Sequence, residues 1–471
     1  MTSYPTRSGS FRHFLRSFLQ DDDARFREVL TEEQIERAAR LQNLCFGTGK
    51  DDIYSLPVTL WAFVTQAASE SKSCLAAVAR VLAWRTSQGR QVCDAGTGAY
   101  CKARAKLTEL FLWFVACDVG RQLEERALDG WRWHGKRAVL VDGSTLSMPD
   151  TEANQEAYPQ SRSQRPGVGF PILRWVALLG LATGAVLDSA FGPYRGKQTG
   201  ETALFRTLLP SLRQDDVVVA DRYYCSYWLV ALLLAEGVDV AFRKHHLRHT
   251  DFRRGRRLGA HDHIVTWTKP QRPEWMDQAT YDSLPKTLAL REVRTQVATP
   301  GCRVKELIVV TTLCDHETYS KEEILDLYHE RWHAEIDLRS IKTQMKMDIL
   351  RCKTPEMVRK EIWVHLLAYN LVRKVMAQAA EAHQLTPRQI SFAGAMQTLN
   401  EFRTHLLQAS ADELFDLTGR ILAAIARHRV GNRPGRCEPR KVKRRPKGYS
   451  RLLIPRAQER AKLMRYRKRV V

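Results

Sequence analysis

Residues 138–146 read AVLVDGSTL, and this stretch marks a change from helical to strand-like sequence. From about residue 24 to 130, apolar residues recur at helical spacing. After Gly135 the chain contains AVLVDGSTL and then residues 175–193, WVALLGLATGAVLDSAFGP, in which Ala-Thr-Gly predicts a hairpin turn between two strands. Helical and apolar strand-like segments then alternate, which gives the order β-β-β-α-β-α-β. This order predicts an α/β fold with a mixed sheet covered by helices.

The alternation is interrupted between residues 251 and 312, where three β-biased segments are separated by Pro and Gly turns. From Lys321 onward the pattern is helical again. These changes predict a helical domain, an α/β core in two parts, a β-rich insertion between them, and a helical and basic C-terminal region. The expected boundaries are 1–134, 135–250, 251–312, 313–400 and 401–471.

Charge is the unusual feature of the composition. The 471 residues are 44% hydrophobic and 27% charged, which is typical of a globular protein, but the net charge is +22. Residues 427–471 hold 18 Lys or Arg against two Glu, so they carry +16 of it. Such a block, with Arg444, Arg445 and Lys447 near its centre, predicts contact with the phosphates of a polyanion. A solubilising tail and an anionic membrane surface are the alternatives.

Cysteine spacing and apolar runs predict a cytoplasmic protein. The ten cysteines include no C-x-x-C pair, which favours reduced thiols in a cytosol. The N-terminal sequence lacks the apolar run of a signal peptide. The longest uncharged apolar run, Trp175 to Leu187, has 13 residues, which is short of the roughly 18 needed to cross a bilayer.

Three acidic residues stand out as candidates for a metal site. Asp142 and Asp221 each close an apolar strand, and Glu335 lies in the later helical segment. If the fold brings them together, their repulsion requires protonation or a bound cation, and hard oxygen ligands favour Mg²⁺ or Mn²⁺. Two such ions activate a water or a 3′-hydroxyl and stabilise the leaving oxygen of a phosphodiester.

Residues 328–342, YHERWHAEIDLRSIK, fit two chemical patterns. His329, Glu330 and His333 spell the H-E-x-x-H of a zinc peptidase. The second pattern, Tyr-x2-Arg-x3-Glu-x6-Lys, fixes four positions and is therefore less easily matched by chance. A zinc peptidase also requires a third ligand, for which Glu356 or Glu361 is the convenient choice, and it does not explain the basic tail. We therefore favour the second pattern, whose residues are Tyr328, Arg331, Glu335 and Lys342.

Helical spacing predicts how this segment sits in the fold. The four residues of the second pattern fall near one face of a helix. A neighbouring apolar stripe would pack the helix on the core and leave the polar stripe facing a cleft. That apolar stripe comprises Leu327, Ala334, Leu338, Ile341 and Met345.

Taken together, these motifs resemble a DDE transposase of a bacterial insertion sequence, in the class with the Y-x2-R-x3-E-x6-K signature. The resemblance covers most of the chain, through VDGST, ADRYYCSY, YHERWHAEIDLRSIK, AYCKARAKL and RRPKGYSRL. It implies an RNase H-like catalytic core interrupted by a β insertion. It also implies that Asp142, Asp221 and Glu335 bind two divalent ions, and that Tyr328, Arg331 and Lys342 grip the DNA backbone near the cut.

The resemblance also implies the partners. These are double-stranded DNA, as the terminal inverted repeats of the element and the target, and a second copy of the chain in the complex that pairs two ends. Such a protein would associate with the nucleoid. A non-catalytic DNA-binding protein on the same scaffold is the alternative function.

Two groups of residues outside the signature are further candidates for DNA contact. Lys102, Arg104 and Lys106 in AYCKARAKL could enter a DNA groove, or could form a solvated basic face. Some members of the family stack a flipped base on a Trp of the insertion, but the strand KELIVVTTL has none. Trp267 and Trp275 lie elsewhere in the insertion, and Trp332 follows Arg331. We include Trp332 among the expected DNA contacts.

Overall fold

A single nine-stranded sheet organises the molecule. The structure, a computed structural model, describes residues 30–47, 52–87, 89–90, 94–245, 247–296, 306–431 and 453–470. Within these ranges the strand order is β3-β2-β1-β4-β5-β9-β8-β7-β6. The strands are β1 Ala138–Ser147, β2 Ile172–Gly180, β3 Val186–Pro193, β4 Val217–Ala220, β5 Asp239–Arg243, β6 Arg256–Gly259, β7 Asp262–Thr268, β8 Thr287–Gln296 and β9 Glu306–Thr311.

The strands of the first half form a mixed sheet, as expected. β1 pairs antiparallel with β2 and parallel with β4, and β4 pairs parallel with β5. Helices α8 (Glu201–Thr207) and α9 (Tyr227–Ala235) connect these strands in the predicted order. A short helix that we did not predict, α7 (Glu152–Ala157), lies between β1 and β2.

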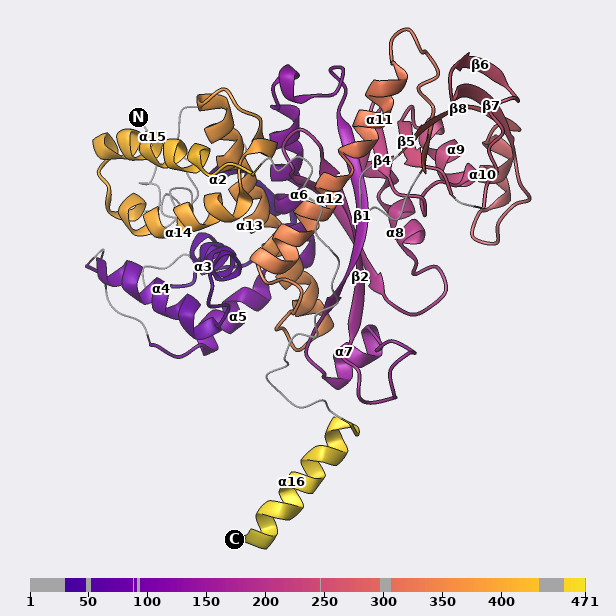
Figure 1. Cartoon of the computed structure of the whole chain (residues 1–471). Helices are drawn as coiled ribbons and strands as arrows, with labels where there is room; N and C mark the ends of the chain where they lie inside the picture. The colour runs from indigo at the N-terminus through magenta and orange to yellow at the C-terminus, as the bar shows by residue number, and fades with distance from the viewer. Residues whose placement is uncertain are drawn as a thin grey trace.

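Both faces of the sheet are buried, which explains the continuous apolar runs of β1 and β4. Side chains alternate along β1: Val139 and Val141 face a core built with α8 and α9. Ala138 and Leu140 face the opposite core, which α6 (Glu109–Glu125) and α13 (Pro355–Ala382) cover. The long helix α13 packs along α6 on this second face, as Figure 1 shows.

The β-rich insertion continues the same sheet. β9, which we had placed in the insertion, pairs antiparallel with β5, and β8, β7 and β6 follow outward. Helix α10 (Gln278–Ser283) lies within this region. The sheet therefore continues without a break from the core into the insertion, because β9, the last strand before residue 312, pairs directly with the core strand β5.

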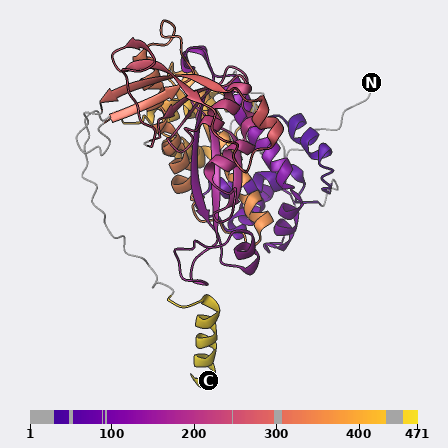
Figure 2. The same ribbon diagram turned by 90° about the vertical axis from the view of Figure 1, so that its right-hand side faces the viewer.

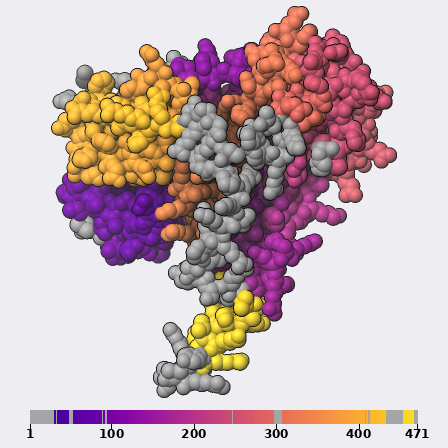
Figure 3. Space-filling view, in the orientation of Figure 1, coloured from indigo at the N-terminus to yellow at the C-terminus, as the bar shows by residue number. Residues whose placement is uncertain are grey.

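Helices from the two ends of the chain form one lobe beside the sheet. The early helices are α2 (Glu32–Leu41), α3 (Leu56–Ala68), α4 (Cys74–Ser87) and α5 (Gly98–Lys106), and the late ones are α14 (Phe392–Gln408) and α15 (Ala411–Arg427). Figure 3 shows the late helices stacked directly against the early ones. The expected boundary between residues 400 and 401 falls inside α14.

The last helix, α16 (Arg456–Val470), projects from the body (Figures 1 and 2). Its first residue, Arg456, pairs with Asp150 at 3.0 Å and lies over the ring of Phe170. The expected DNA contacts Arg444, Arg445 and Lys447 lie outside the described residues. Among the described helices, none combines the length and the apolar composition that crossing a membrane requires.

Candidate active site

The sheet brings Asp142 and Asp221 to the same edge. In the parallel pair of β1 and β4, Val141 lies opposite Ala220, and each aspartate is the next residue along its strand. Pairing with β4 ends there, while β1 continues beside β2 to Ser147. Carboxyl ends of parallel strands are where α/β sheets place their ligands. The prediction that two strand-closing carboxylates lie together is therefore consistent with the register of the sheet.

Asp142 is the electrostatic centre of this edge. One of its oxygens accepts a hydrogen bond from the Gly143 amide at 2.9 Å. Burial, together with the carboxylates of Asp221 and Glu335, raises the pKa of Asp142 to about 6, against the opposing effects of the Gly143 amide and Arg331. The charges of Asp221 and Glu335 thus both act on Asp142, although the three residues come from separate segments.

Glu335 reaches the edge from helix α12 (Trp332–Arg339), which packs against β1. Its carboxylate accepts a hydrogen bond from the Arg331 guanidinium at 2.7 Å, one turn earlier. The Arg331 side chain is 18% exposed and that of Glu335 is 41% exposed. A partly buried ion pair of this kind holds the glutamate in place beside Asp142.

The signature segment is not the single straight helix that we predicted. Helix α11 (Lys321–His329) begins at a capping box between Ser320 and Glu323 and ends at His329, and α12 starts after a break at Glu330 and Arg331. A π-helical turn then follows over residues 340–344. The predicted apolar stripe is buried throughout, so the core fixes the segment while its backbone departs from regular helix. Departures of this kind are frequent at functional sites.

This irregular backbone changes the environment of the signature residues. Tyr328 is 7% exposed, so its ring belongs to the core and does not line the cleft as expected. Burial raises the pKa of its hydroxyl, which Arg331 partly offsets. Lys342, on the π turn, donates a hydrogen bond to the Ser144 hydroxyl at 2.7 Å and is thereby held beside the strand that carries Asp142.

A buried ion cluster fixes α12 to the helical layer. Asp337 is fully buried, and its carboxylate pairs with Arg373 and, at 2.7 Å, with Arg388. Arg373 lies on α13, and Arg388 also donates to the carbonyls of Leu181 and Gly180. Because Asp337 is two residues after Glu335, this cluster determines where Glu335 lies relative to the sheet.

Sequence reasoning missed a fourth carboxylate, Glu201. It is the first residue of α8, and a Cβ on Gly143 would lie 2.5 Å from its Cδ, so the glycine is required for this approach. Burial and Asp221 raise the pKa of Glu201, and Arg174 opposes that shift. The available signal was a Glu in the first turn of a helix, which normally indicates only a favourable interaction with the helix dipole.

The donor set fits a hard divalent cation. All candidate ligands are carboxylates. Burial raises the pKa of Asp142 and the charges of Asp221 and Glu335 add to that shift, so a cation bound here would offset both effects. In the present arrangement Glu335 is directed to Arg331. Within the described part of the chain, no three or more His, Cys, Asp or Glu side chains are arranged to hold a metal ion. Ligation by all three residues therefore requires Glu335 to leave its arginine partner.

The zinc-peptidase pattern does not form a site. His333 pairs with Glu330 of the same motif at 2.9 Å. Of the convenient third ligands, Glu361 accepts the backbone amides of Arg351 and Cys352, and Glu356 pairs with Lys360. These side chains hold local structure, so the pattern is a coincidence of spacing.

The expected DNA contacts Trp332, Lys102, Arg104 and Lys106 differ in their exposure to solvent. Trp332 is 55% exposed at the start of α12, the helix that carries Glu335. Lys102 and Lys106 are exposed on α5, whereas Arg104 is half-buried with its guanidinium over Phe63. The expected basic face of α5 therefore lacks Arg104, because this side chain packs into the helical lobe.

The two tryptophans of the insertion are covered by arginines. Trp267 is 7% exposed, and the Arg248 guanidinium lies 3.9 Å from its ring centroid. Arg206 lies 3.8 Å from the ring centroid of Trp275. Trp332 is therefore the most exposed of these three rings.

Sequence comparison matches the chain to transposases. The family model described as "Transposase DDE domain" covers residues 133–371, just over half of the chain. The transposase InsG of insertion sequence element IS4 from Escherichia coli K12 is 28% identical over 334 residues, which are 70% of this chain and 72% of that protein. The transposase of element IS421 from Escherichia coli is 33% identical over 70 residues, 15% of this chain and 19% of its own length.

Among solved structures, a piggyBac transposase synaptic complex with hairpin DNA aligns over 88% of this chain and 86% of its own, with 10% identity and a TM-score of 0.39. The family model includes all three candidate carboxylates: Asp142 on β1, Asp221 directly after β4, and Glu335 on α12. Its extent shows that this chain belongs to the DDE transposases of bacterial insertion sequences.

Proposed function

We propose that this transposase cuts the ends of its insertion sequence and joins them to target DNA by phosphodiester hydrolysis and transesterification, with two divalent ions held by Asp142, Asp221 and Glu335. Mg²⁺ is the expected ion, and Mn²⁺ would serve as well. The observation that carries the proposal is the register of β1 and β4, which sets the two aspartates side by side, with the Arg331–Glu335 pair facing them.

The residues of the chain have separate roles in this proposal. The bound ions would activate the attacking water or 3′-hydroxyl and stabilise the leaving oxygen. Arg331 pairs with Glu335 in the absence of the ions. When Glu335 turns to the ions, the released guanidinium would add positive charge where a phosphate approaches the carboxylates. Lys342, whose ammonium donates to the Ser144 hydroxyl, would contact the DNA backbone beside Asp142. Tyr328 is buried, and its hydroxyl would position the Arg331 side chain.

The DNA partner and the assembly follow from the same chemistry. Lys102, Lys106 and Trp332 are exposed and available for DNA contact. Arg444, Arg445 and Lys447 belong to a segment of high positive charge that would follow phosphates. Pairing two element ends requires at least two copies of the chain in the active complex, which we propose to be a homodimer.

The test is strand cleavage of a duplex that carries an element end, in the presence of Mg²⁺. We expect Asp142→Asn, Asp221→Asn and Glu335→Gln each to reduce the cleavage rate by a factor of about 10³ or more, with DNA affinity nearly unchanged. Asp326→Asn, at an exposed position on α11, is the matched control and should cleave as wild type does. If the wild type and all four variants bind DNA equally and none cleaves it, the chain is a DNA-binding protein on a nuclease-like scaffold.

A further inference from the structure

A cavity of about 450 Å³ lies between the helical lobe and the segment that follows the signature helix. Its lining comes from α3, α4 and α5, from residues 351–354, and from the start of α13. It is separate from the carboxylates at the edge of the sheet, because none of Asp142, Asp221, Glu335 or Glu201 lines it.

The cavity has an excess of positive charge. Four of its lining residues are cationic, namely Lys72, Arg104, Arg351 and Lys353, and one is acidic, Glu361. That carboxylate is already engaged, because it accepts the backbone amides of Arg351 at 3.0 Å and Cys352 at 2.9 Å. None of the four cations forms an ion pair with a carboxylate in the part of the chain that the structure describes.

Two of these cations are held where water reaches them poorly. The Lys72 ammonium donates to the carbonyl of Ala67, and the residue is 7% exposed. Burial, with the charges of Lys346 and Arg351, lowers the pKa of Lys72 to about 7. The Arg104 Nε is buried without a hydrogen-bond partner, although its guanidinium lies over Phe63 at 4.9 Å. Leaving the Arg104 Nε unsatisfied in this way is costly unless a ligand accepts its hydrogen bond.

A buried histidine adds a hydrogen-bond acceptor. His365 Nδ1 lies 2.8 Å from the carbonyl oxygen of Glu361, so this nitrogen carries the proton. Burial and Lys72 lower the pKa of His365 to about 3, so the ring is neutral. Its Nε2 is buried without a partner and can accept a hydrogen bond from a P–OH group or from a water that hydrates an anion.

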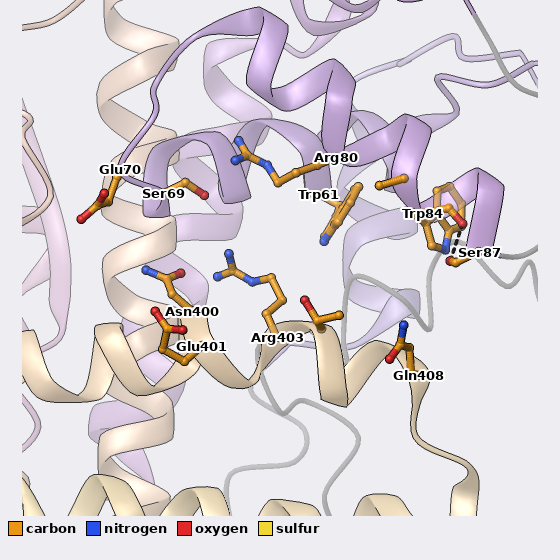
Figure 4. Close-up of a pocket in the computed structure, with 12 residues that line it drawn as sticks. Trp61, Ser69, Glu70, Arg80, Trp84, Ser87, Asn400, Glu401, Arg403 and Gln408 are labelled. Carbon is orange, nitrogen blue, oxygen red and sulfur yellow. Dashed lines mark hydrogen bonds between the residues drawn. The ribbon is translucent and has the colours of Figure 1, made fainter.

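The neighbouring cavity, of about 500 Å³ and shown in Figure 4, lacks this imbalance. Arg80 and Arg403 lie on opposite sides of it, and both side chains extend toward the end where Glu70 and Glu401 lie. Burial and Arg80 lower the pKa of Arg403 to about 10, but the two acids balance the two arginines in number. Charge therefore favours an anion in the first cavity and not in the second.

We infer that the cavity lined by Lys72, Arg104, Arg351, Lys353 and His365 binds a phosphate group. The two planar guanidinium groups of Arg104 and Arg351 and the ammonium groups of Lys72 and Lys353 are typical phosphate donors. The phosphate could come from a DNA strand or from free phosphate, and both offer the same oxygen atoms to the site. Only the DNA source rests on the proposed function. Residues 351–354 line the cavity, and Leu350 just before them donates a backbone hydrogen bond to Ser147 at the end of β1, the strand that carries Asp142.

One of the three cysteines that line the cavity, Cys101, provides a direct readout of binding. Cys101 is half-buried in the cavity, while Cys45, elsewhere in the helical lobe, is exposed and serves as an internal reference. The full chain is alkylated with iodoacetamide in a chelator, so that no strand cleavage occurs, and the two cysteines are quantified by mass spectrometry. We expect millimolar phosphate to slow alkylation of Cys101 at least three-fold relative to chloride at equal ionic strength, and to leave Cys45 unchanged.

The matched variants separate the site from general electrostatics. Arg351→Gln with Lys353→Gln changes two exposed side chains, so folding is preserved, and phosphate should then no longer protect Cys101. Lys286→Gln, at an exposed position in the insertion, removes a positive charge and should retain the protection. Equal alkylation rates of Cys101 in phosphate and in chloride would overturn the inference.

A second arm identifies the source of the phosphate. If a short duplex with an element end protects Cys101 in wild type but not in the double variant, the phosphate belongs to DNA. If inorganic phosphate protects and the duplex does not, the site takes free phosphate. Failure of the proposed function would instead appear as cleavage that survives Asp142→Asn, an assay that does not involve this cavity.

Discussion

Lys342 and Ser144 are 198 residues apart in sequence, yet the lysine Nζ donates a hydrogen bond to the serine Oγ at 2.7 Å. This contact ties the π turn after α12 to the strand that carries Asp142. Burial lowers the pKa of Lys342. The signature lysine is therefore held by the first aspartate's strand as well as by its own helix.

Ser144→Ala should weaken binding of element-end DNA by loosening Lys342. One hydrogen bond to a charged group contributes about 1.5–3 kcal/mol, but the freed lysine can still reach a phosphate. We therefore expect a three- to ten-fold loss in affinity for Ser144→Ala and a larger loss for Lys342→Met, measured by fluorescence anisotropy at fixed salt. Thr145→Val, at the next and exposed position, is the control. A Ser144→Ala protein that binds as wild type does would mean that Lys342 needs no support.

Arg331→Met should increase the affinity of the carboxylates for Mn²⁺ in the absence of DNA. The Arg331 guanidinium forms an ion pair with Glu335 at 2.7 Å, and its charge also lowers the pKa of Asp142. It therefore competes with a cation for the negative charge of these two carboxylates. If Arg331 opposes Mn²⁺ binding by about 1 kcal/mol, its removal lowers the dissociation constant for Mn²⁺ roughly five-fold. Electron paramagnetic resonance titration of Mn²⁺ measures this, with Arg339→Met, exposed on the same helix, as control. Weaker Mn²⁺ binding would show that Arg331 supports the ligand geometry.

Asp337→Asn should lower the stability of the whole core. Its carboxylate is fully buried and neutralises Arg373, which is itself buried on α13. Removing one partner of a buried pair costs about 3–5 kcal/mol. Asp416→Asn breaks the exposed pair with Arg420 and should cost less than about 0.5 kcal/mol. Denaturant unfolding compares the two midpoints, and equal midpoints would mean that the buried cluster is dispensable.

The pH dependence of stability should contain a contribution from Lys72. Its pKa of about 7 in the folded protein lies below the ordinary lysine value of 10.5, so between these values the unfolded chain binds more protons than the folded one. Stability then rises with pH across this window, by at most about 1.4 kcal/mol per unit, and the penalty is fully present below pH 7. Lys72→Met should flatten the rise between pH 7 and 9 in thermal unfolding. An unchanged slope would show that Lys72 titrates normally.

The sequence predicted the elements whose patterns depend on neighbours along the chain. Apolar runs that end in Asp142 and Asp221 predicted two buried strands, and parallel register brings their ends together. The apolar stripe from Leu327 to Met345 predicted the buried face of the signature segment. Both predictions use periodicity, which reports burial directly.

What the sequence could not predict depends on contacts between distant segments. Glu201 is near Asp142 only because Gly143 leaves room for it. Arg104 faces the cavity and not solvent because Phe63, from another helix, lies under its guanidinium. The break at Glu330 and the π turn after Arg339 interrupt a pattern that remains fully helical in its apolar spacing. Periodicity gives no information on such exceptions.

Removing the basic tail should flatten the salt dependence of DNA binding. Residues 432–471 hold 16 Lys or Arg against two Glu, a net charge of +14. Truncation after Ala426, the position that charge alone suggests, would remove His428 and Val430, which bond the backbone of Ser391 and Gln389 at 2.7 and 2.8 Å. Truncation after Gly431 retains these bonds and removes the charge.

The measured quantity is the slope of log affinity against log salt concentration. This slope is negative, and it becomes shallower by about 0.9 for each phosphate contact that is lost. A tail of the same composition in scrambled order is the control, and should keep the wild-type slope because phosphate neutralisation depends on charge and not on order. A truncated protein with the wild-type slope would assign the phosphate contacts to the folded body. In that case Lys102, Lys106 and the lysines and arginines beside the carboxylates would carry the electrostatic part of DNA binding.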